Sequence, residues 1–182
     1  SDSKGIKELQ QILGPRLIVG NGLKPLLFTI QLAFSKLYSN GIIIHILPAW
    51  VSYREHTSML NIETMELLPT GNMWRLTCKD LEWCLEQVKD RPHLILLNSP
   101  NNPTGYVYSN EELKQFAILF KKYNSIVLFD AIYEYLIYPK CKNAANTLDV
   151  YYPEGTIKGS SLSKYFSAGG FRFGWLIFPQ QQ

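Results

Sequence analysis

The sequence predicts an α/β fold with a mostly parallel sheet between two layers of helices, a three-layer αβα arrangement. Apolar runs of strand length alternate with segments of helical periodicity along the chain. These runs are almost continuously apolar, which is typical of strands buried on both faces and therefore of parallel pairing. Polar or glycine-rich clusters follow five of the runs, as expected of a ligand site at the carboxyl edge of such a sheet.

The first part of the chain predicts two helices and three strands. Residues 1–13 have apolar side chains at helical spacing, and a turn at residues 20–22 follows the first strand. A longer helix is expected from Pro25, because proline is favoured at a first helical position. Its apolar face comprises Leu26, Ile30, Ala33 and Leu37. The strands are expected at residues 17–19, 42–47 and 65–68.

Two capping boxes mark helix starts in the second part of the chain. Thr77 and Asp80 form the first box, and Ser109 and Glu112 form the second. The predicted buried faces of these two helices are Leu81, Cys84, Leu85 and Val88, and Leu113, Phe116, Ala117 and Phe120. A short helix is expected over residues 131–136. The remaining strands are expected at residues 94–98, 125–130, 156–160 and 173–178.

Composition favours one globular domain over residues 1–182, with 46% hydrophobic and 18% charged residues. The net charge of +3 is small and diffuse, which argues against nucleic-acid or membrane partners. No apolar run reaches membrane-spanning length, and no signal pattern precedes the first helix. The three cysteines lack metal-site spacing and predict free thiols in a reducing compartment, which we take to be the cytoplasm. The three histidines are far apart and do not predict a metal site.

The five polar clusters offer groups suited to a phosphate-bearing aldehyde cofactor. They are Gly20–Lys24, Trp50 with Tyr53, Asn98–Gly105, Asp130, and Ser160–Lys164. The Lys164 amine can form an imine with an aldehyde, while nearby hydroxyls and the Arg172 guanidinium can hold a phosphate. A glycine turn before a helix presents free N–H groups to an anion. Taken singly, each cluster also has an ordinary structural explanation, such as a turn, a helix cap, a core aromatic or a surface lysine.

Three motifs in order resemble the class I/II aminotransferases, which are pyridoxal 5'-phosphate enzymes of fold type I. The motifs are Asn98-Ser99-Pro100-Asn101-Asn102-Pro103-Thr104-Gly105, Asp130-Ala131-Ile132-Tyr133-Glu134, and Ser161-Leu162-Ser163-Lys164 followed by Arg172. The resemblance extends from about Gly5 to Pro179. It implies the large, cofactor-binding domain of such an enzyme, which moves an amino group from an L-amino acid to a 2-oxo acid.

The resemblance also implies a role for each matching residue. Lys164 would form the imine and then act as the general base, and Asp130 would pair with the pyridine nitrogen. Tyr133 and Asn102 would hydrogen-bond the phenolic oxygen of the ring. The phosphate would be bound by Ser161, Ser163 and Arg172, together with the turn at Gly22, Leu23 and Lys24. Trp50 would stack on the ring.

Two departures from the family pattern qualify the resemblance. Leu23 stands where many relatives have a small or hydroxylated residue, so one side-chain bond to the phosphate would be lost. Relatives also have an N-terminal segment and a small C-terminal domain with a substrate-binding arginine, so residues 1–182 are expected to be an incomplete enzyme. The family forms dimers, which predicts a homodimer for the full-length protein.

Three alternatives stay open at this point. A lyase or synthase acting on another α-substituted amino acid uses the same motifs with the same cofactor. The chain could instead be a truncated, catalytically incompetent fragment that only binds the cofactor. A Rossmann-type nucleotide-binding domain is disfavoured, because no third glycine follows Gly20-Asn21-Gly22 at the fingerprint position.

Overall fold

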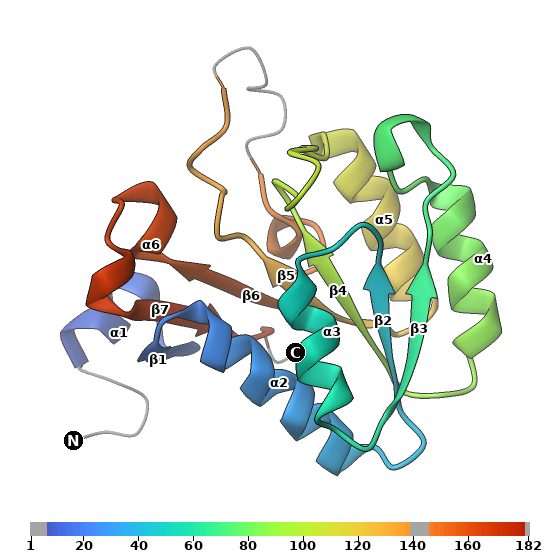
Figure 1. The fold of residues 1–182 in the computed structure, drawn as a ribbon, viewed down its shortest axis with the longest axis horizontal. Coiled ribbons are helices and arrows are strands. Elements are labelled where there is room, and N and C mark those ends of the chain that lie inside the picture. Colours follow the sequence, from blue (N-terminus) through green and yellow to red (C-terminus); the bar gives the residue numbers. More distant parts are fainter. Residues whose placement is uncertain (1–6, 139–145, 181–182) are drawn as a thin grey trace.

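The computed structural model describes residues 7–138 and 146–180 and confirms the α/β fold with a mostly parallel sheet (Figure 1). In the order in which they lie in the sheet, its seven strands are β1 (Leu17–Asn21), β7 (Phe173–Ile177), β6 (Thr156–Ser161), β5 (Ile126–Asp130), β4 (His93–Asn98), β2 (Ile42–Ile46) and β3 (Glu63–Leu67). Strands β2 to β6 pair in parallel, whereas β7 is antiparallel to both of its neighbours.

Helices cover both faces of the sheet, as the continuous apolar strands predict. Helices α2 (Leu23–Leu37) and α3 (Val51–Ser58) lie on one face, and α4 (Cys78–Val88) and α5 (Asn110–Lys122) lie on the other. Strand β4 shows why both layers are needed, because Leu94 and Leu96 pack in the cluster with α2 while Ile95 and Leu97 pack in the cluster with α4 and α5. The shorter elements are α1 (Lys7–Leu13), η1 (Asn72–Trp74), η3 (Leu148–Val150), α6 (Leu162–Tyr165) and η4 (Gly169–Phe171).

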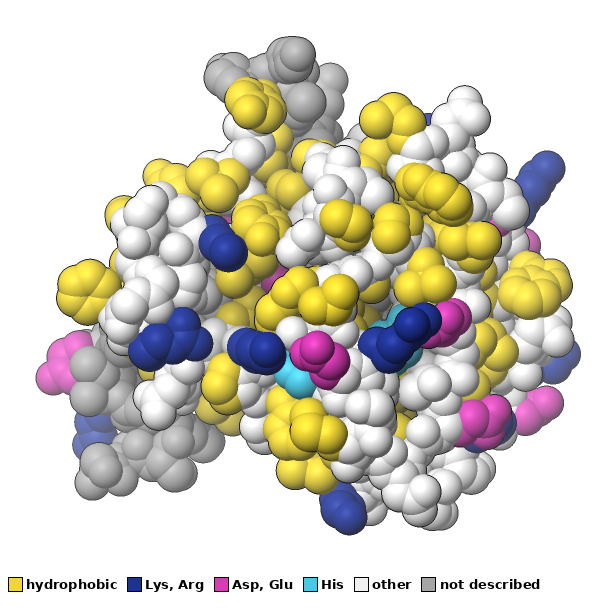
Figure 2. Space-filling model, in the orientation of Figure 1, with side chains coloured by type: hydrophobic (Ala, Val, Ile, Leu, Met, Phe, Trp, Pro, Cys, Tyr) yellow, Lys and Arg dark blue, Asp and Glu magenta, His cyan; other side chains and the backbone are white. Residues whose placement is uncertain are grey.

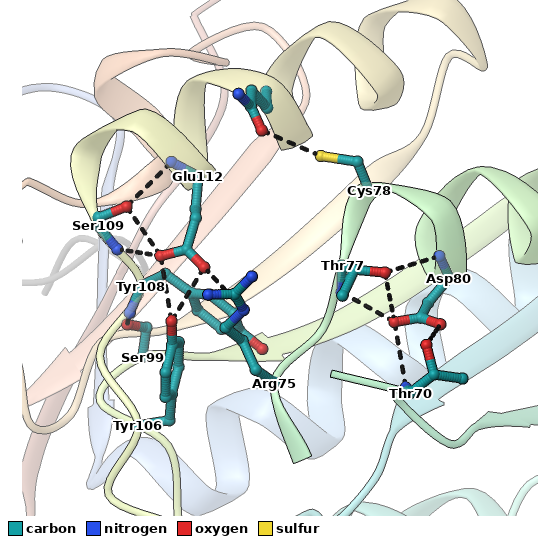
Figure 3. A network of polar contacts seen from close by, with 11 residues as sticks. Thr70, Arg75, Thr77, Cys78, Asp80, Ser99, Tyr106, Tyr108, Ser109 and Glu112 are labelled. Atoms are coloured by element: carbon teal, nitrogen blue, oxygen red, sulfur yellow. Dashed lines mark hydrogen bonds and ion pairs between the residues drawn. The ribbon is translucent and has the colours of Figure 1, made fainter. Parts of the chain in front are cut away.

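Both predicted capping boxes are confirmed, and Figure 3 shows their hydrogen bonds. The Glu112 carboxylate accepts bonds from the Ser109 N–H at 2.8 Å and from the Tyr106 hydroxyl at 3.0 Å. Arg75 lies 3.5 Å from the same carboxylate. This network therefore fixes the start of α5 and also the end of the loop that leaves β4.

The structure corrects the predicted face of α2. The helix begins at Leu23 rather than at Pro25, and Ala33 and Leu37 are exposed. The buried side chains are Leu23, Leu26, Leu27, Ile30, Gln31 and Phe34. The helix turns these side chains toward the sheet in place of Ala33 and Leu37. This orientation is favoured because burying Phe34 removes more apolar surface from water than burying Ala33 does.

Three further corrections concern segments near the carboxyl edge of the sheet. Residues 131–136 form turns rather than a helix, in which the Glu134 N–H donates to the Ala131 carbonyl at 2.9 Å. Helix α3 was not predicted, because its buried residues Ser52, Tyr53, His56 and Thr57 are mostly polar and lack apolar periodicity. Strand β3 ends at Leu67, which leaves Leu68 exposed.

The first six residues of the predicted N-terminal helix lie outside the described residues. No helix in the described ranges combines the length and apolarity needed to cross a membrane.

Candidate active site

The strand directions bring the predicted clusters to one edge of the sheet. Strands β1 and β6 are both antiparallel to β7, so they run in the same direction as each other and as the parallel strands. The carboxyl ends of β1, β2, β4, β5 and β6 therefore share one edge, as predicted. The amino end of β7 lies at that edge too, which places Arg172 beside the turn that follows Asn21.

A cavity of about 320 Å³ lies at this edge. Every predicted site residue except Gly22 and Ser161 lines it. Five lining residues were not assigned to the site from the sequence: Leu27, Tyr53, Asn98, Ile132 and Gly169. Three basic side chains (Lys24, Lys164 and Arg172) and one acidic side chain (Asp130) line it, so its charge favours an anionic ligand.

Asp130 is the buried acid of the cavity. It ends β5, and its carboxylate accepts bonds from the Tyr53 hydroxyl at 2.6 Å and from the Ile132 N–H at 3.1 Å. Burial raises the pKa of Asp130 to about 6, and the Tyr53 hydrogen bond opposes that rise. Burial and the neighbouring Asp130 also raise the pKa of Tyr53, so its phenol keeps its proton and acts as a donor.

The loop after β4 is held by Asn98, which belongs to the first family motif but was given no role from the sequence. Asn98 pairs with Asp130 across the sheet and donates from Nδ2 to the Asp130 carbonyl at 2.9 Å. Its Oδ1 accepts from the Asn102 N–H at 2.7 Å. Asn98 therefore fixes the Asn102 loop relative to Asp130. The sequence does hint at this role, because Asn98 ends a buried apolar strand and a buried polar side chain there needs hydrogen-bond partners.

Lys164 and Tyr133 approach the cavity from different segments. Lys164 belongs to the short helix α6 after β6, and its Nζ lies 5.8 Å from the centre of the Tyr133 ring. Tyr133 lies in the turn that follows β5 and is half-buried. Lys164, Tyr133 and Asp130 therefore line one cavity. Lys164 comes from α6, whereas Asp130 ends β5 and Tyr133 lies in the turn after it.

Arg172 and the start of α2 form a basic corner of the site. The Arg172 guanidinium donates to the Asn21 carbonyl at 3.3 Å and to the Gly169 carbonyl at 3.0 Å. Gly22 has a φ of 88°, a conformation that favours glycine, and a Cβ there would lie 2.3 Å from Arg172 Nη2 and so displace the guanidinium. No side chain caps α2 and no acid lies in its first turn, which leaves N–H groups at a positive helix end. The Leu23 side chain instead packs against Gly159.

Ser161 and Ser163 lie at the start of α6. Ser161 is buried, and its Oγ accepts from the Ser163 N–H at 3.0 Å and lies 2.8 Å from the Phe173 carbonyl oxygen. Its hydroxyl therefore caps the lysine's helix in this structure. A contact between Ser161 and a phosphate stays a prediction.

Trp50 lies at the N-terminal end of α3, between the cavity and a second hollow. Its ring is 5.6 Å from the Tyr53 ring, and Lys24 Nζ lies 5.3 Å from its centre. The second hollow is larger, about 720 Å³, and has Trp50 as its only residue in common with the predicted site. Figure 2 shows hydrophobic side chains gathered near the start of α3 and the carboxyl ends of β2 and β3, as located in Figure 1. We assign the site to the smaller cavity because it contains Lys164 and Asp130.

The comparisons with known proteins agree on one family. The family model for aminotransferase class I and II matches residues 7–181. An aspartate aminotransferase of Pyrococcus horikoshii is 33% identical, over 82% of this chain and 38% of the relative. Human kynurenine–oxoglutarate transaminase 3 is 36% identical, over 58% of this chain and 23% of the relative. The solved structure of Thermus thermophilus aspartate aminotransferase with maleate is 26% identical with a TM-score of 0.83, over 97% of this chain and 48% of that chain. The chain therefore spans about half or less of the length of these relatives.

Proposed function

This chain belongs to the class I and II aminotransferases, and from that premise we propose that its cavity holds pyridoxal 5'-phosphate and serves the transfer of an amino group from an L-amino acid to a 2-oxo acid. Residues 1–182 would form the cofactor-binding large domain of the enzyme. The relatives named as aspartate aminotransferases make aspartate the first amino donor to test. The unpaired thiols of Cys78 and Cys84 suit a reducing compartment, which we propose is the cytoplasm.

The proposal is carried by the buried Asp130 carboxylate and the Lys164 amine lining the same cavity. A buried carboxylate is costly unless a cation or several donors satisfy it. Within residues 7–138 and 146–180, no lysine, arginine or histidine forms an ion pair with Asp130. A protonated pyridine nitrogen would be a suitable partner, and it would return the pKa of Asp130 to lower values.

The cofactor, when bound, supplies an aldehyde carbon that accepts amines and a ring that stores electrons. Lys164 Nζ would hold that carbon as an imine, and after its release would accept the proton from the substrate α-carbon. Asp130 would keep the ring nitrogen protonated, and Tyr53 would keep Asp130 ionised. Tyr133 and Asn102 would donate to the phenolic oxygen, and Trp50 would cover the ring face.

The phosphate would be bound at the basic corner of the cavity. Arg172 would pair with it, and the first N–H groups of α2 would donate to it. Lys24 and the Ser163 hydroxyl line the same cavity and would add weaker contacts. Leu23 would contribute only its backbone N–H, because its side chain packs on Gly159.

We also propose that the full-length protein is a homodimer. Three aromatic residues in or next to α6 support this assembly, because Tyr135, Tyr165 and Phe166 are 60%, 47% and 63% exposed. Their rings contact one another, with centres 5.0 Å and 4.6 Å apart. Clustered exposed aromatics are typical of interaction surfaces. Sedimentation of the full-length protein measures the assembly, and a monomer would contradict this proposal.

The test is an absorbance titration of the chain with pyridoxal 5'-phosphate, followed by borohydride reduction and peptide mapping. We expect the label on Lys164 and its loss in Lys164→Ala. Lys24→Ala is the matched control, because Lys24 lines the same cavity but is expected to leave the label in place. A label elsewhere, or a label that persists in Lys164→Ala, would overturn the assignment.

Turnover is a separate measurement on the full-length protein with aspartate and 2-oxoglutarate. Formation of a new 2-oxo acid and a new amino acid indicates transamination. Release of ammonia and pyruvate indicates a lyase instead. Cofactor capture without either product indicates a cofactor-binding protein that does not turn over these substrates.

A further inference from the structure

A largely buried ion pair lies outside the lining of the cavity and is not used by the proposed chemistry. Lys158 Nζ lies 2.7 Å from Glu134 Oε2, and the two side chains are only 14% and 10% exposed. Every other ion pair among the described residues has at least one partner more exposed than 40%. Lys158 Nζ also donates to Thr147 Oγ1 at 3.2 Å. This pair therefore differs from the surface pairs, which contribute little to stability.

The pair joins the two segments that carry Tyr133 and Lys164. Glu134 follows Tyr133 directly in the turn after β5, and Lys158 lies on β6, which leads into the lysine helix α6. A backbone bond joins the same segments nearer to the strand ends, because the Ala131 N–H donates to the Gly159 carbonyl at 2.8 Å. Residues 132–138, the described part of the chain after Ala131, pair with no strand. Along the turn, the Glu134–Lys158 pair is the side-chain link nearest Tyr133, and the next is the contact between the Tyr135 and Tyr165 rings, whose centres are 5.0 Å apart.

Stability alone does not account for such a pair. Two buried charges lose their hydration, and replacing a buried pair with apolar residues is often neutral or stabilising. A buried pair does, however, restrict geometry, because neither charge tolerates separation from the other in a site of low polarity. A change in the turn that moved Tyr133 would have to break this contact.

We infer that the Lys158–Glu134 ion pair is a positioning device that holds the Tyr133 phenol at a fixed place relative to the Lys164 amine. This inference rests on the proposed function, since it concerns how Tyr133 acts on the bound cofactor. Neither Lys158 nor Glu134 touches the cavity, and both act through Tyr133. The phenol would donate to the ring oxygen and so favour the unprotonated state of the neighbouring imine nitrogen.

The experiment measures the pH midpoint of the cofactor absorbance change in the chain loaded with pyridoxal 5'-phosphate. We expect Tyr133→Phe to raise this midpoint by about one pH unit, the value of one good hydrogen bond. Glu134→Gln and the Lys158→Met/Glu134→Gln double variant are expected to raise it in the same direction by no more than that. In the Tyr133→Phe background, the double variant is expected to add no further shift.

Two controls separate positioning from loss of folding. Urea unfolding is expected to show Glu134→Gln less stable than the double variant, because the single change leaves Lys158 buried without its partner. If the single variant fails to fold, the double variant still gives the midpoint. Lys122→Met breaks an exposed pair with Glu82 and is expected to leave the midpoint unchanged.

Each outcome decides the inference. An unshifted midpoint in the double variant, with the wild-type band intact, overturns the positioning role and leaves the proposed function standing. A further shift in the Tyr133→Phe background overturns it as well, because the pair would then act by another route. If the wild-type chain shows no band on Lys164, the proposed function fails and this inference fails with it.

Discussion

The Tyr53→Phe substitution removes one hydroxyl from the cavity and tests the electrostatics around Asp130. This hydroxyl donates to Asp130 Oδ2 at 2.6 Å, and both side chains are buried. A hydrogen bond to a charged group is worth about 1.5–3 kcal/mol, which corresponds to about one to two pKa units. We therefore expect the pKa of Asp130 in the cofactor-free chain to rise by about one unit or more above its present value of about 6.

The effect on stability has a definite sign. Burial raises the pKa of Asp130 from its ordinary value of 3.8 to about 6, so the folded state favours the protonated carboxyl. The resulting contribution to the free energy of unfolding is fully present below pH 3.8 and is lost as the pH rises through about 6. The total loss is about 3 kcal/mol. In Tyr53→Phe the loss becomes larger and continues to a higher pH.

Urea unfolding of the cofactor-free chain between about pH 4 and about pH 8 measures this difference. We expect Tyr53→Phe to cost more at the higher pH, because the lost hydrogen bond is stronger to the ionised carboxylate. Asp130→Asn removes the titrating group, and in that background the cost of Tyr53→Phe is expected to lose its pH dependence. An equal loss of unfolding free energy at both pH values in the chain that retains Asp130 would contradict a stronger hydrogen bond from Tyr53 to the ionised carboxylate.

Three other substitutions test the glycine turn and the helix cap. Gly22→Ala places a Cβ 2.3 Å from Arg172 Nη2, and we expect a loss of about 1–3 kcal/mol in unfolding free energy together with weaker binding of inorganic phosphate by calorimetry. Gly105→Ala is the matched control, because φ is 70° but no atom lies within 4 Å; it is expected to keep phosphate affinity, and a similar loss of affinity there would contradict the role of the Arg172 contact. Ser109→Ala removes the α5 cap and is expected to lower the unfolding free energy by about 1 kcal/mol in urea while cofactor affinity stays the same. Lower cofactor affinity in Ser109→Ala would show that the cap also acts on the site.

Local signals predicted those elements whose hydrogen bonds are themselves local. Both capping boxes involve partners three residues apart, so the residue types at those spacings were sufficient to place α4 and α5. The apolar strands were found because continuous burial on two faces requires continuous apolar character. Helix α3 was not predicted because the side chains that it buries are mostly polar, and a search for apolar periodicity does not detect polar side chains.

The family motifs located most of the cavity, but they did not supply its internal partners. Tyr53 and Asp130 are separated by 77 residues and meet only because β2 and β5 both end at the same edge. Asn98 joins Asp130 across neighbouring strands in the same way. Neither contact has a local signature, since a tyrosine after a strand and an asparagine at a strand end occur in many unrelated settings.

Residue types at short fixed spacings were enough to predict the fold class, the capped helices and most of the segments that line the cavity. The buried face of α2, the turn at residues 131–136 and the pairing of Glu134 with Lys158 follow instead from the three-dimensional arrangement of the chain. These features depend on the order and direction of strands in the sheet. That order brings distant residues together, and burial then makes each polar contact between them energetically consequential.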